Sequence, residues 1–523
     1  MINYSIKKVK DMSIEELIGQ VIMIGLPYTY LDDGYKKFIA EYKIGNYILF
    51  ARNYVDSKQM KIFMRDLYQY TELVTGSYPL VSIDQEGGMV VRLFKDVTFP
   101  ASPLTTSATT TRCAPYLTGK IIANDMLKHG INLNLAPCLE INQDLLNPLV
   151  NVRGYGATKE IVLENASKFV LGLKDGGVLP CIKHFPGAGS STKDSHLELP
   201  IINDSKEQLL SYNMYPFANL IDSDCLMTSH CIYQSFDEIP STLSKILLTD
   251  VLRKKMGFNG LIISDGMEMN AIKDYYGLGK GCIMALNAGC DLLLLCHEYE
   301  QQKIAFDAVK KAVIDGVIKR ETLEEKVERI NKKKEFLKLS LSAYFTQEQY
   351  QQVKEEHQIM EEIVDNSYTL IMGKAPYLTD KTLILCANAK VGSIVEDELD
   401  GCNLANELRD KFKNHTIIKF TKDESFKDDI LKIIDDFDNI IIYSYDAYND
   451  IVQKDTINAL LNTSKDVITS KDVFVVSIKG PSDRAYFNNL KNYACLYEYT
   501  PNSIKTIIKQ LKKEIKLNGK LPL

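Results

Sequence analysis

Two titratable residues, two positions apart, follow a proline- and glycine-containing turn and have the types needed for proton transfer. The stretch Lys183-His184-Phe185-Pro186-Gly187 continues to Asp194 and His196. In an extended segment, residues i and i+2 face the same side, so Asp194 can hold one ring nitrogen of His196 while the other faces a substrate. A neighbouring carboxylate raises the pKa of a histidine, which suits a general acid. The pattern alone is weak and is more often that of a surface or metal-binding pair.

A second candidate is Asp265, which directly follows the apolar run Gly260–Ser264. A carboxylate delivered to the end of a buried strand can attack the anomeric carbon of a sugar, as in a retaining glycosidase. A helix cap or a magnesium ligand would also place an aspartate there, and chemistry alone does not choose among them. Glu268, three residues further on, is also typical of a capping box.

The elements that must position these residues alternate between short apolar runs and longer amphipathic segments. Eight runs are predicted strands: Gln20–Leu26, Asn46–Phe50, Pro79–Ile83, Leu133–Pro137, Val178–Lys183, Cys225–Thr228, Gly260–Ser264 and Asp291–Cys296. This rhythm predicts an α/β fold, an N-terminal (β/α)8 TIM-like barrel, whose active site lies at the carboxyl ends of the strands. Polar clusters follow the runs: Arg52-Asn53, Asp84-Gln85-Glu86, Glu140, Lys183-His184, Ser229-His230, Asp265 and His297. One such cluster can simply cap a helix, but their recurrence predicts a site.

A second, smaller domain is predicted after the barrel. We place the catalytic barrel at 1–330, a helical linker at 331–377 and a C-terminal α/β sandwich domain at 378–523. The sandwich is predicted from five runs: Thr382–Ala387, Thr416–Phe420, Asn439–Tyr445, Val473–Ile478 and Ala494–Tyr499. No glycine-rich phosphate loop follows any of these runs, so nucleotide binding is not expected.

Composition excludes several classes of function. The 62 basic and 68 acidic residues are mixed along the chain and give a net charge of -6, so no nucleic-acid partner is expected. No signal peptide or membrane span is visible, and we expect a cytoplasmic protein without a membrane partner, as a monomer or homodimer. The eleven cysteines include no Cys-x-x-Cys pair and are expected to be reduced core thiols.

The Lys-His-Phe-Pro-Gly stretch followed by Asp-Ser-His closely resembles the signature of bacterial β-N-acetylglucosaminidases of glycoside hydrolase family 3. Further matching motifs run in order along the barrel: Gly19-Gln20 with Met23, Leu49–Asn53, Asp84–Gly88 with Arg92, Leu135–Pro137, Arg153–Gly156, Met227–His230, Pro240–Ser244, Gly257–Asp265 and Ala288–Asp291. Less specific matches follow at Lys479–Asp483 and Gly519–Pro522.

The resemblance implies a retaining, exo-acting enzyme that releases terminal β-linked N-acetylglucosamine through an aspartyl glycosyl-enzyme. Its substrates would be cell-wall-derived muropeptides, as in peptidoglycan recycling, or chitooligosaccharides. It implies Asp265 as nucleophile and His196 as general acid/base, oriented by Asp194. It implies that the terminal sugar is bound by Asp84, Arg92, Arg153, Lys183 and His184, with His230 near the same site. No cofactor and no metal are implied.

Four positions depart from the family pattern. Ala188 and Ser190 stand where the family usually has His and Asp, Glu140 stands for an Asp, and Gly266 follows the nucleophile in place of an acidic residue. None of the four has an assigned chemical role, so we expect altered loop dynamics or aglycone fit.

Three other functions are weighed against this one. A β-glucosidase or xylosidase would use a carboxylate acid elsewhere in the chain, which the Asp-Ser-His motif argues against. A β-N-acetylglucosaminide phosphorylase stays an alternative, because a histidine repels an incoming phosphate less than a glutamate does. A non-catalytic amino-sugar-binding protein is a further alternative, against which both Asp265 and His196 are present.

Overall fold

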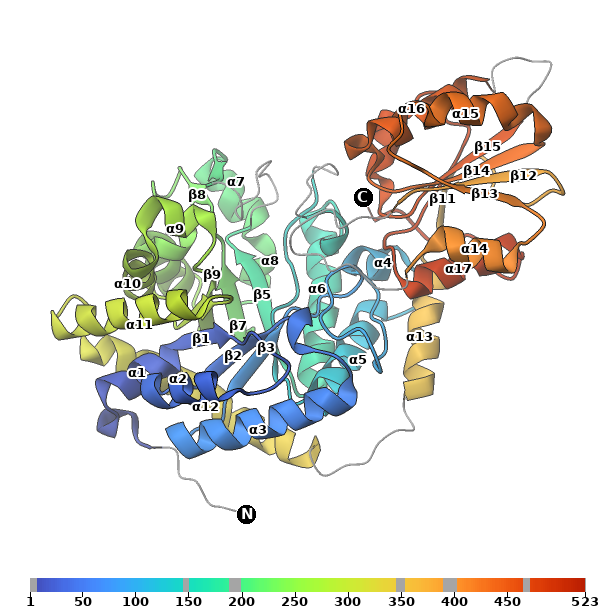
Figure 1. Ribbon diagram of the computed structural model, residues 1–523. Helices are drawn as coiled ribbons and strands as arrows, with labels where there is room; N and C mark the ends of the chain where they lie inside the picture. The colour runs from blue at the N-terminus through green and yellow to red at the C-terminus, as the bar shows by residue number, and fades with distance from the viewer. Residues whose placement is uncertain are drawn as a thin grey trace.

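Figure 1 shows the computed structural model, which describes residues 7–143, 150–187, 199–344, 353–388, 402–463 and 471–522. The N-terminal part is a closed barrel surrounded by helices, and the C-terminal part is a separate α/β sheet at the upper right of the view. The predicted fold class, a barrel followed by a smaller α/β domain, is confirmed.

Eight parallel strands close the barrel in the order β1-β10-β9-β7-β5-β4-β3-β2. They are β1 (Ile22–Gly25), β2 (Asn46–Leu49), β3 (Leu80–Ile83), β4 (Leu133–Asn134), β5 (Leu179–Phe185), β7 (Cys225–Thr228), β9 (Leu261–Gly266) and β10 (Leu292–Leu295). Each strand overlaps one of the eight predicted runs, so all eight strand predictions are confirmed. A short parallel pair, β6 (Ile201–Ile202) and β8 (Ile232–Tyr233), lies outside the barrel.

The barrel strands are apolar along most of their length because both of their faces are covered. All four residues of β1 and of β10 are buried, as are Leu261–Ser264 in β9. Such runs are typical of parallel strands with helices outside and packed side chains inside. The register between β5 and β7 shifts between Ile182 and Phe185, which is the part of β5 that carries Lys183 and His184.

Helices follow the strands and begin at capping residues that the sequence supplies. Ser13 and Glu16 form a reciprocal capping box, and Asp32, Asp56 and Thr158 accept hydrogen bonds from the first turns of their helices. The longer helices are α1 (Ile14–Val21), α2 (Asp33–Tyr42), α3 (Ser57–Thr75), α5 (Ala114–Lys128), α6 (Lys159–Asp175), α10 (Leu278–Ala288), α11 (Tyr299–Ile314) and α12 (Arg320–Tyr344). The shorter ones are α4 (Pro103–Ala108), α7 (Lys206–Gln208), α8 (Tyr215–Asn219) and α9 (Asn270–Tyr276), and Ile246–Lys255 is a π-helix.

The C-terminal sheet has six strands in the order β11-β16-β15-β14-β12-β13. They are β11 (Thr369–Met372), β12 (Thr382–Cys386), β13 (Thr416–Lys419), β14 (Asn439–Ser444), β15 (Asp472–Ser477) and β16 (Asn492–Cys495). Five helices accompany them: α13 (Val353–Asp365), α14 (Leu404–Lys411), α15 (Phe426–Ile433), α16 (Ile451–Thr463) and α17 (Pro501–Leu511).

The prediction of five strands is wrong because it omits β11. This strand is four residues long, lies at the sheet edge and pairs antiparallel with β16. The run Thr369–Met372 is apolar but short, and it directly follows a helical pattern, so it was not separated from the predicted helical linker. Helix α12 crosses the predicted boundary between the barrel and the linker at residue 330. Strand β11 lies within the predicted helical linker, before its boundary at residue 377. The domain limits themselves stay a prediction.

The C-terminal part packs on the barrel beside the segment that carries Arg153. Val152 shares a small apolar cluster with Cys495 and Tyr497 of the C-terminal part. The buried carboxylate of Glu498 accepts hydrogen bonds from the backbone of Ser102 and the hydroxyl of Thr105, at 2.7 and 2.8 Å. The last residues return to the barrel, where the Pro522 carbonyl accepts a hydrogen bond from the backbone of Ala157 at 3.3 Å. Both parts therefore hold this rim of the barrel.

Nine of the eleven cysteines are buried, and all eleven lie in the described part of the chain, where none forms a disulfide. Burial raises the pKa of several of these thiols, among them Cys181, Cys225 and Cys290. Within the same described ranges, no helix combines the length and apolarity that a membrane crossing requires.

Candidate active site at the barrel mouth

Lys183 lies at the centre of a buried group of four charged side chains. Its Nζ lies 2.7 Å from Asp84 Oδ1 and 2.7 Å from Glu86 Oε1. Glu86 also accepts two hydrogen bonds from Arg153, 2.8 Å from Nε and 2.7 Å from Nη2. The side chains of Lys183 and Glu86 are 2% and 1% exposed. Two cations and two carboxylates therefore balance one another where little water is available.

This pairing keeps Glu86 and Lys183 ionised. Burial disfavours the Glu86 carboxylate, but attraction by Arg153 and Lys183 outweighs burial and holds the pKa of Glu86 well below its usual range. Burial likewise disfavours the Lys183 ammonium, but the carboxylates of Asp84 and Glu86 outweigh it and raise the pKa of Lys183. The result is a fixed polar wall at the ends of β3 and β5.

The turn after β3 that carries the two carboxylates is held by Gln85. Its side-chain oxygen accepts a hydrogen bond from the backbone of Arg92 at 2.8 Å, and its own backbone donates to Asn134 Oδ1 at 3.1 Å. Gly87 has φ +107°, and a Cβ there would lie 2.2 Å from the carbonyl oxygen of Ala101, so only glycine fits. The turn also brings Arg92, which is 6% exposed, to the same side of the barrel.

Asp265 lies on the opposite side of the mouth, at the carboxyl end of β9, four strands away from β3 in either direction. The four residues before it are buried, whereas Asp265 is partly exposed. Its Oδ1 accepts a hydrogen bond from the backbone of Gly266 at 2.8 Å. Burial, and then the carboxylates of Glu268, Asp265 and Asp84, raise the pKa of Cys296. Carboxylates from both sides of the mouth therefore affect the pKa of the same buried thiol.

His230 lies behind this strand end. Its ring is fully buried, with Nδ1 2.8 Å from Thr242 Oγ1 and Nε2 2.9 Å from the carbonyl oxygen of Gly266. The predicted place of His230 is among the sugar-binding residues or in a supporting position close to them. With both nitrogens bonded to protein, the ring supports the backbone next to Asp265.

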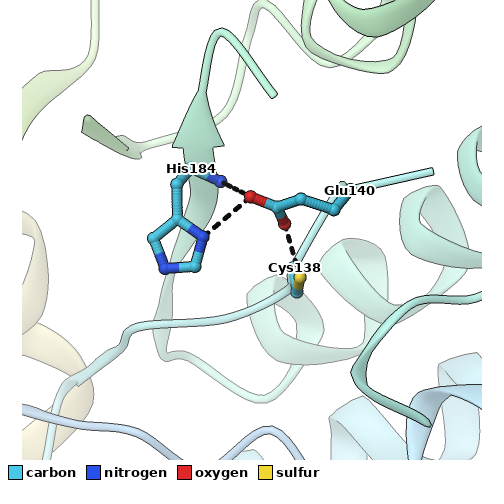
Figure 2. A group of neighbouring side chains, drawn as sticks. All are labelled: Cys138, Glu140 and His184. Carbon is cyan, nitrogen blue, oxygen red and sulfur yellow. Dashed lines mark hydrogen bonds and ion pairs between the residues drawn. The ribbon is translucent and has the colours of Figure 1, made fainter. Parts of the chain in front are cut away.

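His184 lies beside the charged group and is held by Glu140 (Figure 2). Glu140 Oε1 lies 2.8 Å from His184 Nδ1 and accepts a second hydrogen bond, also of 2.8 Å, from the His184 backbone. The other Glu140 oxygen accepts a hydrogen bond from the Cys138 thiol. Burial disfavours the Glu140 carboxylate, but His184 outweighs burial and lowers the pKa of Glu140. The His184 side chain is 19% exposed, so the ring reaches the mouth from a buried anchor.

The barrel part of the chain is similar to known glycoside hydrolases. Residues 13–332 match the N-terminal domain of glycosyl hydrolase family 3. A protein of Tolumonas auensis named beta-hexosaminidase is 33% identical over 282 residues, which cover 53% of this chain and 82% of that protein. A Haemophilus influenzae protein of the same name is 32% identical over 287 residues, 53% of this chain and 80% of that protein.

This chain belongs to glycosyl hydrolase family 3. The solved structure of a family 3 beta-N-acetylglucosaminidase from Paenibacillus sp. str. FPU-7 is 30% identical, covers 98% of both chains and has a TM-score of 0.90. A beta-glucoside phosphorylase structure covers 98% of this chain and 94% of that one, with a TM-score of 0.79. At 22% identity the phosphorylase shows a shared fold alone.

In this family 3 hydrolase, other polar side chains at the strand ends form hydrogen bonds with backbone groups. Arg52 donates to the carbonyl oxygens of Leu26 and Cys296 at 3.0 and 2.6 Å. Glu268 accepts hydrogen bonds from the backbone of Cys296 and His297 at 2.6 and 3.0 Å, so the capping-box interpretation of Glu268 is wrong. A carboxylate that faces the loop after β10 satisfies backbone donors of that loop, which the local spacing could not reveal.

The predicted site residues divide into three groups. Asp84, Lys183 and Arg153 meet in one ion cluster, His184 and Arg92 flank it, and Asp265 faces it with His230 behind. Asp194 and His196 lie outside the described residues, as do the departures Ala188 and Ser190. Two residues without a predicted role, Glu86 and Gln85, join the group. Their signal was their place in the Asp-Gln-Glu-Gly-Gly turn.

Proposed function

We propose that this hydrolase releases terminal β-linked N-acetylglucosamine with retention of configuration, and that Asp265 is the nucleophile. The observation that carries the proposal is a partly exposed carboxylate facing a fixed cluster of two cations and two carboxylates across the barrel mouth. The names of the hexosaminidase relatives and the match to the Paenibacillus enzyme along 98% of both chains support the choice of sugar.

The ion cluster suits the binding of a neutral, highly hydroxylated sugar. Asp84 is 18% exposed and offers carboxylate oxygens to sugar hydroxyls, while two donors of Lys183 already point at Asp84 and Glu86. Because these charges are already paired with one another, no ion pair has to break when the sugar binds. A sugar that lacks one matching hydroxyl leaves a buried polar group without a hydrogen bond, which costs about 1 to 3 kcal/mol. We assign Asp84, Arg92, Arg153, Lys183 and His184 to the terminal sugar.

The proposed reaction has two steps. In the first, a carboxylate oxygen of Asp265 forms a bond to the anomeric carbon while the bond to the leaving oxygen breaks, and His196 gives that oxygen a proton. In the second, His196 takes a proton from water, the water oxygen bonds to the anomeric carbon and the Asp265 carboxylate leaves. Two displacements at one carbon restore the β configuration. Asp194 would orient the His196 ring throughout.

Product analysis tests the proposal. Purified protein is incubated with N-acetylglucosamine-containing disaccharides, a chitooligosaccharide and a muropeptide fragment, and proton NMR follows the first product formed. We expect β-N-acetylglucosamine to appear before mutarotation. Initial release of the α anomer would exclude the retaining mechanism, and the ranking of the substrates would identify the aglycone.

The same assay run with and without phosphate separates a hydrolase from a phosphorylase. The glycosyl-enzyme is common to both, and only the acceptor of the second step differs. We expect free N-acetylglucosamine to dominate in both samples. If N-acetylglucosamine 1-phosphate dominates when phosphate is present, the enzyme is a phosphorylase and the assigned residues keep their roles.

A further inference from the structure

We propose that Cys138, Glu140 and His184 form a binding site for a thiophilic divalent cation, for which Zn²⁺ is the best fit. Each residue offers one ligand atom, and the three atoms lie within 4.8 Å of one another. In Figure 2 the Glu140 carboxylate lies between the thiol of Cys138 and the imidazole of His184, so that all three groups converge. Thiolate, imidazole and carboxylate are the ligand types that zinc takes in proteins.

The separations are close to those that a tetrahedral site requires. Zinc bonds of about 2.0 to 2.3 Å place neighbouring ligand atoms roughly 3.3 to 3.7 Å apart. Glu140 now lies 2.8 Å from His184 Nδ1 and within hydrogen-bond distance of Cys138. Replacing these two hydrogen bonds by bonds to one ion needs each pair to open by about 1 Å or less, which side-chain rotation provides.

Two neighbouring strand ends fix the three ligands. Cys138 and Glu140 are two residues apart in an extended segment after β4, so their side chains face the same side. Cys138 forms a parallel bridge with Lys183, and the backbone of Leu139 donates to the Lys183 carbonyl at 2.7 Å. His184, the residue after Lys183, is thereby placed opposite both ligands. The site is therefore held by backbone pairing and needs no loop to order.

Protons and charge balance when the ion binds. A carboxylate only accepts hydrogen bonds, so the proton between His184 and Glu140 is on Nδ1. Binding requires the Cys138 thiol to release its proton to solvent and the imidazole proton to move from Nδ1 to Nε2. The thiolate and the Glu140 carboxylate then neutralise the two charges of the ion. Neutrality matters here because Cys138 and Glu140 are 1% and 4% exposed.

Occupation of this site would inhibit the enzyme, a consequence that rests on the proposed function. His184 is assigned to the terminal sugar, and Glu140 holds both its ring and its backbone amide. An ion on Nδ1 turns the ring toward Cys138 and removes the net negative charge beside the sugar site. We expect micromolar Zn²⁺ to raise KM for a nitrophenyl β-N-acetylglucosaminide, and a chelator to reverse the effect.

Cobalt spectroscopy tests the site without relying on activity. The full-length protein is treated with chelator, desalted and titrated with Co²⁺. We expect a thiolate-to-cobalt charge-transfer band that saturates at one ion per chain and disappears when Zn²⁺ is added. Cys138→Ser, which keeps a donor for Glu140, should lose the band and bind at least about 10-fold more weakly. Cys113→Ser, which changes the exposed cysteine before α5, is the matched control and should keep both.

Two outcomes overturn the site: no charge-transfer band in the wild-type protein, or a band that persists in Cys138→Ser. Glu140→Gln provides a second variant of nearly equal size, which removes one anionic ligand and should weaken cobalt binding while the circular dichroism spectrum stays unchanged. If the protein cleaves no amino sugar, the proposed function fails while cobalt binding still decides the site. Cobalt binding through Cys138 without any change in KM would uphold the site and overturn its link to sugar binding.

Discussion

The two sides of the barrel mouth hold their charges in different ways. On the β3 and β5 side, Lys183 and Arg153 both pair with Glu86, and all three side chains are almost completely buried. On the β9 side, Asp265 is a partly exposed carboxylate whose neighbour Gly266 is held from behind by the uncharged contacts of His230. A binding wall gains from paired charges that cannot move, whereas a nucleophile must present an oxygen to the anomeric carbon.

The largest loss of activity is expected when the nucleophile is removed. Asp265→Ala should lower kcat for a nitrophenyl β-N-acetylglucosaminide by at least about 10⁴-fold, because no glycosyl-enzyme can form. Steady-state kinetics and circular dichroism of the same sample check that turnover is lost and the fold kept. Turnover near the wild-type rate would remove Asp265 from this role.

His196→Ala should slow the cleavage of substrates with poor leaving groups far more than that of substrates with good ones. A disaccharide needs a proton on its leaving oxygen and should react about 10²- to 10⁴-fold more slowly, whereas cleavage of a dinitrophenyl glycoside should change far less. The glycosyl-enzyme should then accumulate, since no base activates water, and azide should release it as the β-glycosyl azide. Mass spectrometry of the intact protein detects the intermediate. Equal losses for both substrates, with no intermediate, would make His196 a positioning residue.

Removing the buried anion should destabilise the opposite side of the mouth. Glu86→Ala leaves Lys183 and Arg153 without their shared partner, and we expect a loss of about 3 to 5 kcal/mol in the free energy of unfolding. Glu164→Ala breaks an exposed ion pair with Lys168 and should cost less than about 1 kcal/mol. Urea unfolding of the three proteins measures the difference. Similar losses of stability in both variants would show that the buried ion cluster contributes no more to stability than an exposed ion pair.

The same carboxylate predicts a pH dependence. The folded pKa of Glu86 lies below the unfolded value of about 4.3, so the unfolded chain takes up the proton first. Its stabilising contribution is complete above that pH and is lost as the pH falls toward the folded pKa. The difference in the free energy of unfolding between wild type and Glu86→Gln should therefore shrink as the pH falls from about 5 to about 3. In this range the carboxyl group of the unfolded chain takes up its proton. A constant gap would contradict the low folded pKa.

The barrel was predictable and its polar contacts were not, for a physical reason. The buried barrel strands are apolar runs set apart by polar clusters, and all eight were found from the sequence, whereas the short edge strand β11 directly follows a helical pattern and was missed. Asp84, Lys183 and Asp265 were identified at strand ends by residue type. The contacts of Glu86 and Glu268 were not predicted, because their partners Arg153 and Cys296 are distant in the sequence and only closure of the barrel brings them together.

The smallest expected effect distinguishes positioning from binding on the β9 side. His230→Ala leaves the Gly266 carbonyl and the Thr242 hydroxyl without a buried ring partner, which should cost about 1 to 3 kcal/mol of stability. Because the ring is fully buried, KM should stay within about twofold, while kcat falls roughly tenfold as the backbone beside Asp265 loosens. His129→Ala is the matched control: this buried histidine also has two contacts, to the Asp125 carbonyl at 2.6 Å and Ser57 Oγ at 2.8 Å. It should lose similar stability and keep kcat. A rise in KM with unchanged kcat in His230→Ala would instead place His230 among the residues that contact the sugar.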